Sequence, residues 1–144
     1  MNVKVKDVKQ LKLTDLEGLD PITVYTDEWE KSRDDGSIQY QGRITIICYD
    51  TILSYFWEAM NEPLEYFFIH TNVEYLIGKF IQASYWSYCP VAHEISYTQS
   101  GRIQEKEADV SIDMSDNQKE YIIKVIKAVQ AGIRELIAQS EGRE

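Results

Sequence analysis

The 144-residue sequence has little of what marks several common protein classes. It contains only two cysteines, Cys48 and Cys89, which are too few for a disulfide framework. No apolar run approaches the roughly eighteen residues needed to cross a bilayer. The opening residues also lack the continuous apolar core of a signal peptide. These absences predict a protein of the reducing cytosol with no membrane partner.

The sequence also shows no sharp change in composition that would mark a domain boundary. Three prolines and seven glycines are scattered along the chain, and neither a linker nor an internal repeat is visible. The hydrophobic fraction of 44% and the charged fraction of 27% are ordinary for a soluble protein with a core. We therefore expect residues 1–144 to form a single domain.

Basic residues are scarce between positions 13 and 78. Thirteen Asp and Glu residues stand there against Lys31, Arg33 and Arg43, a net charge of −10 in a chain whose total is −9. Binding to nucleic acid through phosphates needs clustered Lys and Arg, so no direct nucleic-acid partner is expected. The segment is also rich in aromatic residues, namely Tyr25, Trp29, Tyr40, Tyr49, Tyr55, Phe56, Trp57, Tyr66, Phe67, Phe68 and Tyr75. Carboxylates beside such rings favour contact with a basic protein surface.

Several segments have the character of strands. The β-branched segments Ile22–Tyr25 and Arg43–Tyr49 predict two strands, of which the second is apolar enough to lie inside a sheet. The polar segment Thr26–Gly42 between them predicts a long, exposed acidic loop. Alternation of apolar and polar residues predicts a strand at Val3–Lys6 and another at Arg102–Met114. Val91–Tyr97 is predicted as a strand joined to the latter across residues 99–101.

Four segments are predicted to be helical. Thr51–Met60 follows a possible cap at Asp50, and Leu64–Ile69 and Val73–Ile81 come next. The clearest helix covers residues 115–140, because it opens with a capping box and then repeats apolar residues at helical spacing. Strands, helices, strands and a long C-terminal helix predict an α+β domain with an antiparallel sheet.

Candidates for chemistry are weak. Cys48, His70, Cys89 and His93 have the residue types of a zinc site, but their spacing lacks the close ligand pairs of zinc modules. A nucleophile–base pair of Cys89 and His93 has no third orienting group. Paired carboxylates occur at Asp27-Glu28, Asp34-Asp35 and Glu58 with Glu62, which solvation explains. With no phosphate loop or nucleophile elbow, we expect no enzyme, no cofactor and no metal.

The better candidates form a binding surface. Exposed carboxylates suit the rim of an interface, and Tyr and Trp suit its centre. The residues predicted to meet a partner are Asp27, Glu28, Trp29, Glu30, Asp34, Asp35, Tyr85, Trp86 and Tyr88.

The segment Leu11–Phe80 carries a series of motifs. In order they are LKLTDLEGLDPITVYTDEW, GRITIICYD, SYFWEAMNEPLEYFF and TNVEYLIGKF. This order resembles a group of small accessory proteins of bacteriophages and prophages of enteric bacteria. The chain departs from the group at Thr26–Gly42, where a shorter Gly-rich loop is usual, and at Glu58, where a small residue is usual. The resemblance implies a phage protein working in the bacterial cytoplasm, and it implies no chemistry.

These observations lead to one main hypothesis. The chain would bind a host protein with a basic surface, such as a nuclease, a CRISPR effector, a restriction enzyme or a recombination enzyme. Its carboxylates would stand in for DNA phosphates and its rings would supply anchors. Two alternatives remain open, namely a nucleotide-binding or nucleotide-sequestering protein that stacks bases on Tyr85, Trp86 and Tyr88, and an immunity protein against a basic toxin.

Overall fold

Among the described residues the strands come first and the helices follow. The computed structural model describes residues 1–88 and 115–142, with side chains described to Gln82 and again from Ser115. The elements are the strands β1 (Lys9–Leu13), β2 (Ile22–Ser32), β3 (Ile38–Cys48) and β4 (Thr51–Met60) and the helices α1 (Leu64–His70), α2 (Val73–Tyr88) and α5 (Asp116–Glu141). The predicted α+β fold with an antiparallel sheet and a long C-terminal helix is confirmed.

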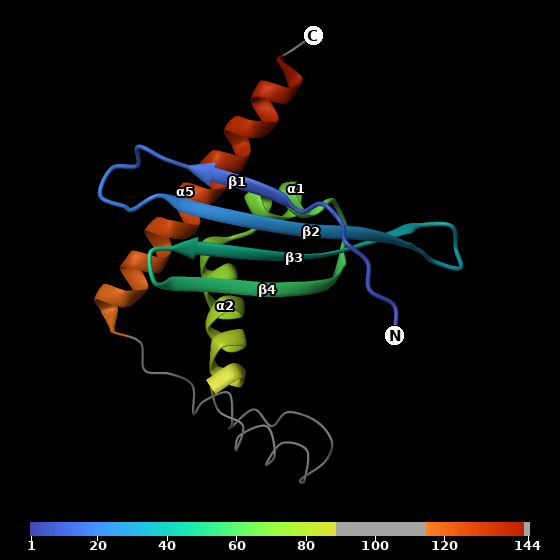
Figure 1. Cartoon of the computed structure of the whole chain (residues 1–144), viewed down its shortest axis with the longest axis horizontal. Helices are drawn as coiled ribbons and strands as arrows, with labels where there is room; N and C mark the ends of the chain where they lie inside the picture. Colours follow the sequence, from blue (N-terminus) through green and yellow to red (C-terminus); the bar gives the residue numbers. More distant parts are fainter. Residues whose placement is uncertain (89–114, 143–144) are drawn as a thin grey trace.

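The four strands form an antiparallel meander in the order β1-β2-β3-β4. All three helices lie on one face of this sheet (Figure 1). The longest pairing joins β2 and β3, from Ile22 opposite Cys48 to Ser32 opposite Ile38. The predicted interior position of the second strand is confirmed, because β3 lies between β2 and β4.

The core lies between the sheet and the helices. Alternation along β2 and β3 turns one set of side chains toward the helices, and Ile22, Val24, Ile44 and Ile46 are completely buried there. The predicted periodicity of α5 supplies the opposite wall, with Val125, Ile126, Val129 and Ile133. The predicted capping box is present, since the side chains of Ser115 and Gln118 bond each other's backbone N–H groups.

The helix predicted over Thr51–Met60 is wrong, because these residues form β4. A tight turn at Tyr49 and Asp50 brings Thr51 opposite Cys48, so Asp50 lies in this turn and caps no helix. Tyr49 adopts a left-handed φ of 55° in the turn. Pairing with β3 and burial of Leu53 and Trp57 outweigh the helix-forming residues of the segment.

Strands also occupy most of the segment predicted as the acidic loop Thr26–Gly42. β2 continues to Ser32 and β3 begins at Ile38, so only residues 33–37 form a turn. The strands were not predicted because their side chains are mostly polar: β2 is exposed on both faces from Glu28 to Ser32, so no apolar alternation marks it. The predicted exposure of the acidic residues is observed at Glu28, Glu30, Asp34 and Asp35.

The other predicted elements differ from the observed ones in position or in length. Val3–Lys6 has no regular structure, and the first strand lies instead at Lys9–Leu13. The helix predicted over Val73–Ile81 continues to Tyr88. The strands predicted at Val91–Tyr97 and Arg102–Met114 lie outside the described residues.

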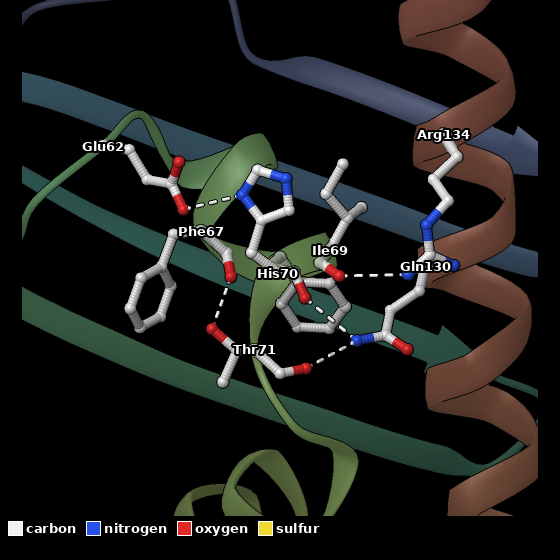
Figure 2. A network of polar contacts seen from close by, with 8 residues as sticks. Glu62, Phe67, Ile69, His70, Thr71, Gln130 and Arg134 are labelled. Carbon is white, nitrogen blue, oxygen red and sulfur yellow. Dashed lines mark hydrogen bonds and ion pairs between the residues drawn. The ribbon is translucent and has the colours of Figure 1, made fainter.

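A polar network fastens α5 to the end of α1 (Figure 2). The last carbonyl groups of a helix lack partners within that helix, and α5 supplies them here. The buried side-chain amide of Gln130 donates to the carbonyl oxygens of Phe68 and Thr71, each at 3.0 Å. Arg134 donates to the carbonyl oxygen of Ile69, also at 3.0 Å. These bonds fix the position of α1, which in turn contacts the hairpin of β2 and β3.

Candidate functional site

The hairpin of β2 and β3 extends past the helices that cover its first half (Figure 1). We call residues 27–42 the hairpin arm. Burial along β2 ends at Thr26, and from Glu28 to Ser32 every residue is exposed. The arm carries five carboxylates against Lys31 and Arg33. It is therefore an acidic projection that contacts α1 at its base, through Glu28 and Gly42, and is exposed along β2 from Glu28 to Ser32.

Alternation divides the acidic residues of the arm between two faces. Because Ile22, Val24 and Thr26 point toward the helices, Glu28 and Glu30 share their face, whereas Asp27 and Trp29 lie on the open face. The predicted binding residues of β2 are therefore close in space but do not form a single flat surface.

Trp29 is held firmly although 42% of its surface is exposed. Its ring stacks on Phe56 of β4 with a centroid distance of 5.6 Å and an angle of 18° between the planes. Its indole N–H donates to the side-chain oxygen of Gln41, its cross-strand neighbour. The Arg43 guanidinium lies 5.6 Å from the centre of the Phe56 ring. Trp29 thus exposes part of a ring whose orientation is fixed by its neighbours.

Glu28 connects the arm to the helical layer. Its carboxylate accepts a hydrogen bond of 3.0 Å from the backbone N–H of Leu64, the first residue of α1. This N–H has no partner within the helix, and a carboxylate suits the positive end of the helix dipole. Glu28 therefore anchors the base of the arm to α1.

A cavity of about 360 Å³ opens on the arm. It is lined by Glu28, Trp29, Glu30 and Tyr40. By strand alternation the side chains of Glu28, Glu30 and Tyr40 share one face of the arm, whereas that of Trp29 points to the other. Glu30 and Tyr40 are direct cross-strand partners in the β2–β3 ladder. No hydrogen bond or ion pair engages the Glu30 carboxylate within the described part of the chain. The cavity combines the groups that bind an ammonium or guanidinium ion.

The turn at the tip of the arm is ordered by Asp35. Its carboxylate accepts hydrogen bonds from the backbone N–H and the hydroxyl group of Ser37, at 2.9 and 2.6 Å. These bonds, with a smaller contribution from Arg33, lower the pKa of Asp35 below its usual value of 3.8. Gly36 takes a left-handed φ of 89°, which closes the turn. Asp35 is therefore occupied with local structure.

The other predicted binding residues differ in their surroundings. Asp27 forms a 3.0 Å ion pair with Lys6, and both side chains are well exposed. Asp34 has no hydrogen bond or ion pair among the described residues. Tyr85, Trp86 and Tyr88 belong to the last turns of α2, but their side chains lie outside what the structure describes.

Sequence reasoning missed the residues that hold Trp29. Gln41 was assigned to a loop and Phe56 to a helix, so neither could be placed beside Trp29. The alternation along Thr51–Met60 is the signal that could have indicated a strand there. It places Leu53 and Trp57 on one face and Phe56 on the other.

The candidates for metal or nucleophilic chemistry do not assemble among the described residues. No group of three potential metal ligands occurs there. Cys48 is buried and accepts a hydrogen bond of 3.2 Å from the Tyr121 hydroxyl, which together with burial raises the pKa of Tyr121 to about 12. His70 is exposed and pairs with Glu62 at 2.9 Å. Cys89 and His93 lie outside the described residues.

Comparison with known proteins places the chain in one family. A model of a phage protein family, Phage_phiTE_072, matches residues 1–139. The chain belongs to this phage family. The phage setting implied by the resemblance is thereby confirmed, whereas the enteric host stays a prediction. No curated protein and no solved structure matches the chain. None of the described helices is long and apolar enough to cross a membrane.

Proposed function

We propose that this phage-family protein is a non-enzymatic binding protein that engages a basic surface of a bacterial host protein through its hairpin arm. The observation that carries the proposal is the cavity on the arm where the side chains of Glu28 and Glu30 lie beside Tyr40. A Lys or Arg side chain of the partner would receive charge-assisted hydrogen bonds from the carboxylates and cation–π contact from the ring of Tyr40. The arm would thus recognise a basic residue that projects from its partner.

Trp29 would anchor the complex from the open face of the arm. Tryptophan is enriched among the residues that dominate interface energies. Its contacts with Gln41 and Phe56 fix the ring before binding, so little side-chain entropy remains to be lost. A partner that grips the arm would bury Trp29 on one face and fill the acidic cavity on the other.

The charge of the arm favours a particular kind of partner. Five carboxylates against two basic side chains would steer a basic surface toward the arm over a distance of about one Debye length. Host proteins that handle nucleic acid present such surfaces, among them nucleases, CRISPR effectors, restriction enzymes and recombination enzymes. The carboxylates would occupy positions that the partner uses for phosphates, so binding would block its nucleic-acid site.

The test is a pull-down from host lysate with quantitative mass spectrometry at about 50 mM and about 500 mM salt. The test variant carries Glu30→Gln and Asp34→Asn, because neither carboxylate has a described partner whose loss would disturb the fold. The matched control carries Glu17→Gln and Glu120→Gln, two exposed residues outside the arm, and removes the same charge.

We expect the wild type and the control variant to capture one basic nucleic-acid-handling protein at low salt and to release it at high salt. The arm variant should lose most of this capture, because it lacks two of the five carboxylates. Equal capture by the arm variant and the control would show that the arm is not the binding surface. Capture that is insensitive to salt would show that its carboxylates do not drive the binding.

A further inference from the structure

The edge strand β1 is open on its outer side. Among the described residues it pairs only with β2, from Lys9 opposite Thr26 to Leu13 opposite Ile22. An unpaired strand edge offers backbone N–H and C=O groups to an additional strand. β1 therefore has the hydrogen-bonding capacity for a fifth strand.

Helix α5 continues beyond the edge of the sheet (Figure 1). It contacts β1 closely at Gly132, where an added Cβ would lie 2.7 Å from Cδ2 of Leu13. Beyond this contact its C-terminal turns extend past β1 (Figure 1). No described strand lies under those turns, so they leave an uncovered surface of α5 on which a fifth strand could pack.

A groove runs between β1 and the C-terminal half of α5. It encloses about 600 Å³. The apolar residues that line it are Leu11, Leu13, Leu16, Ala128, Ala131 and Leu136. The leucines among them are only partly buried, so the groove leaves apolar surface exposed to water beside the open backbone edge. An apolar groove next to a free strand edge is the arrangement that binds extended peptides by strand addition.

The charged residues near β1 favour one kind of segment in the groove over another. Residues 1–12 contain Lys4, Lys6, Lys9 and Lys12 against the single acidic residue Asp7. Lys6 pairs with Asp27 and Lys9 with Glu65, which leaves Lys4 and Lys12 without an ion-pair partner among the described residues. If two copies of the chain paired antiparallel through β1, the lysines of one copy would approach those of the other, which is unfavourable. A segment that carries carboxylates would instead meet complementary charge. The carboxylate of Glu135, which also lines the groove on α5, accepts a hydrogen bond from Gln139.

We propose that β1 and the adjoining groove bind an extended segment of a partner protein in which apolar residues alternate with Asp or Glu. The segment adds to β1 as a fifth strand. Because successive side chains of a strand point to opposite faces, its apolar residues enter the groove under α5. Its carboxylates then lie on the open face of the sheet, the face that carries Lys12 opposite Thr23. This surface differs from the hairpin arm in position and in charge, and it does not depend on the function proposed above.

The probe is a fluorescein-labelled peptide of sequence VEVDVEV, titrated with the full chain and followed by fluorescence anisotropy. The matched peptide VKVRVKV keeps the alternation and reverses the charge. Amide hydrogen exchange of Lys9–Leu13 reports whether the peptide pairs with β1. We expect a Kd of the order of 10–100 μM for the acidic peptide. We also expect slower exchange in β1 and binding at least about tenfold weaker for the basic peptide.

Two variants locate the binding. Ala131→Phe fills the groove from an exposed position and should weaken binding about tenfold. Ala138→Phe adds the same ring at an exposed position of α5 that does not line the groove, and should leave the Kd unchanged. Lys12→Glu should weaken binding about fivefold, because it reverses the charge that faces the carboxylates.

Four results would overturn the proposal. They are no binding by the folded wild type, equal binding of the two peptides, unchanged binding by Ala131→Phe, and no added protection in β1. A concentration-dependent dimer that Ala131→Phe abolishes would assign the groove to a second copy of the chain, and so would also overturn it.

Discussion

The two halves of the β2–β3 hairpin share one uninterrupted ladder but differ in what surrounds them. In the covered half, Ile22, Val24, Ile44 and Ile46 have no exposed surface. In the arm, Trp29 is 42% exposed and Ile38 is 45% exposed. Backbone pairing alone therefore does not determine the role of a strand. The described helices convert one half into core and leave the other half largely exposed to solvent.

The two halves are also held by different forces. The covered half is stabilised by apolar burial against α5. The arm depends on a few specific side-chain contacts, chiefly the Trp29–Phe56 stack and the hydrogen bond from Leu64 to Glu28. Substitutions in the covered half should consequently change global stability, whereas substitutions in the arm should mainly change local order and binding.

The largest expected effect is loss of core packing. Ile46→Ala removes a completely buried side chain and should lower the free energy of unfolding by about 3 kcal/mol. Ile38→Ala removes the same atoms from the exposed end of β3 and should change stability by less than about 0.5 kcal/mol. Urea denaturation measures both variants. Similar losses for the two would contradict the division between core and arm.

The next effect concerns the network that fixes α1. Gln130→Ala leaves the carbonyl oxygens of Phe68 and Thr71 without their donor and should cost about 2 kcal/mol of stability. Gln139→Ala, at an exposed position of the same helix, is the control and should be nearly neutral. If thermal unfolding separated the two variants by less than their experimental error, the network would not stabilise the helical layer.

A smaller effect is expected at the base of the arm. Glu28→Ala removes the acceptor for the Leu64 N–H and should cost about 1 kcal/mol, with faster hydrogen exchange at the start of α1. Glu28→Gln keeps an oxygen that can accept this bond and should have a milder effect. Equal exchange in the two variants would show that the hydrogen bond does not hold the arm to α1.

The smallest effect is the pH response of the tip. Because the pKa of Asp35 is lowered in the folded state, the contribution of its carboxylate is complete above its usual pKa of 3.8. It is lost as the pH falls through the lowered folded value. The Ser37 amide, which donates to Asp35, should therefore exchange faster at acid pH relative to a fully unfolded reference. Asp35→Ala should remove this pH dependence, and its persistence in that variant would refute the assignment.

Sequence reasoning recovered the elements whose signal is local. The β-branched segments at Ile22–Tyr25 and Arg43–Tyr49 and the capped periodicity of α5 each specify their structure without distant contacts. The helix prediction for Thr51–Met60 is wrong because it followed local signals. Glu58, Ala59 and Met60 favour a helix, but pairing with β3 makes the segment a strand.

The candidate site was predicted in composition but not in geometry. The acidic residues and Trp29 were recognised from the charge and aromatic content of their segment. Their separation onto two faces follows from strand alternation, which a loop assignment hides. The bond from Leu64 to Glu28 joins residues 36 positions apart, and no local pattern records such a contact.

The central claim, that the arm and not the opposite end of the sheet meets the partner, has one direct test. A photo-crosslinking amino acid is placed at Ile38 in the arm or at Tyr49, which is 79% exposed at the other end of β3. Each variant is irradiated in host cells, and its products are analysed by mass spectrometry. We expect a discrete adduct with a basic nucleic-acid-handling protein from position 38 and none from position 49. An adduct with such a protein from position 49 alone would contradict it.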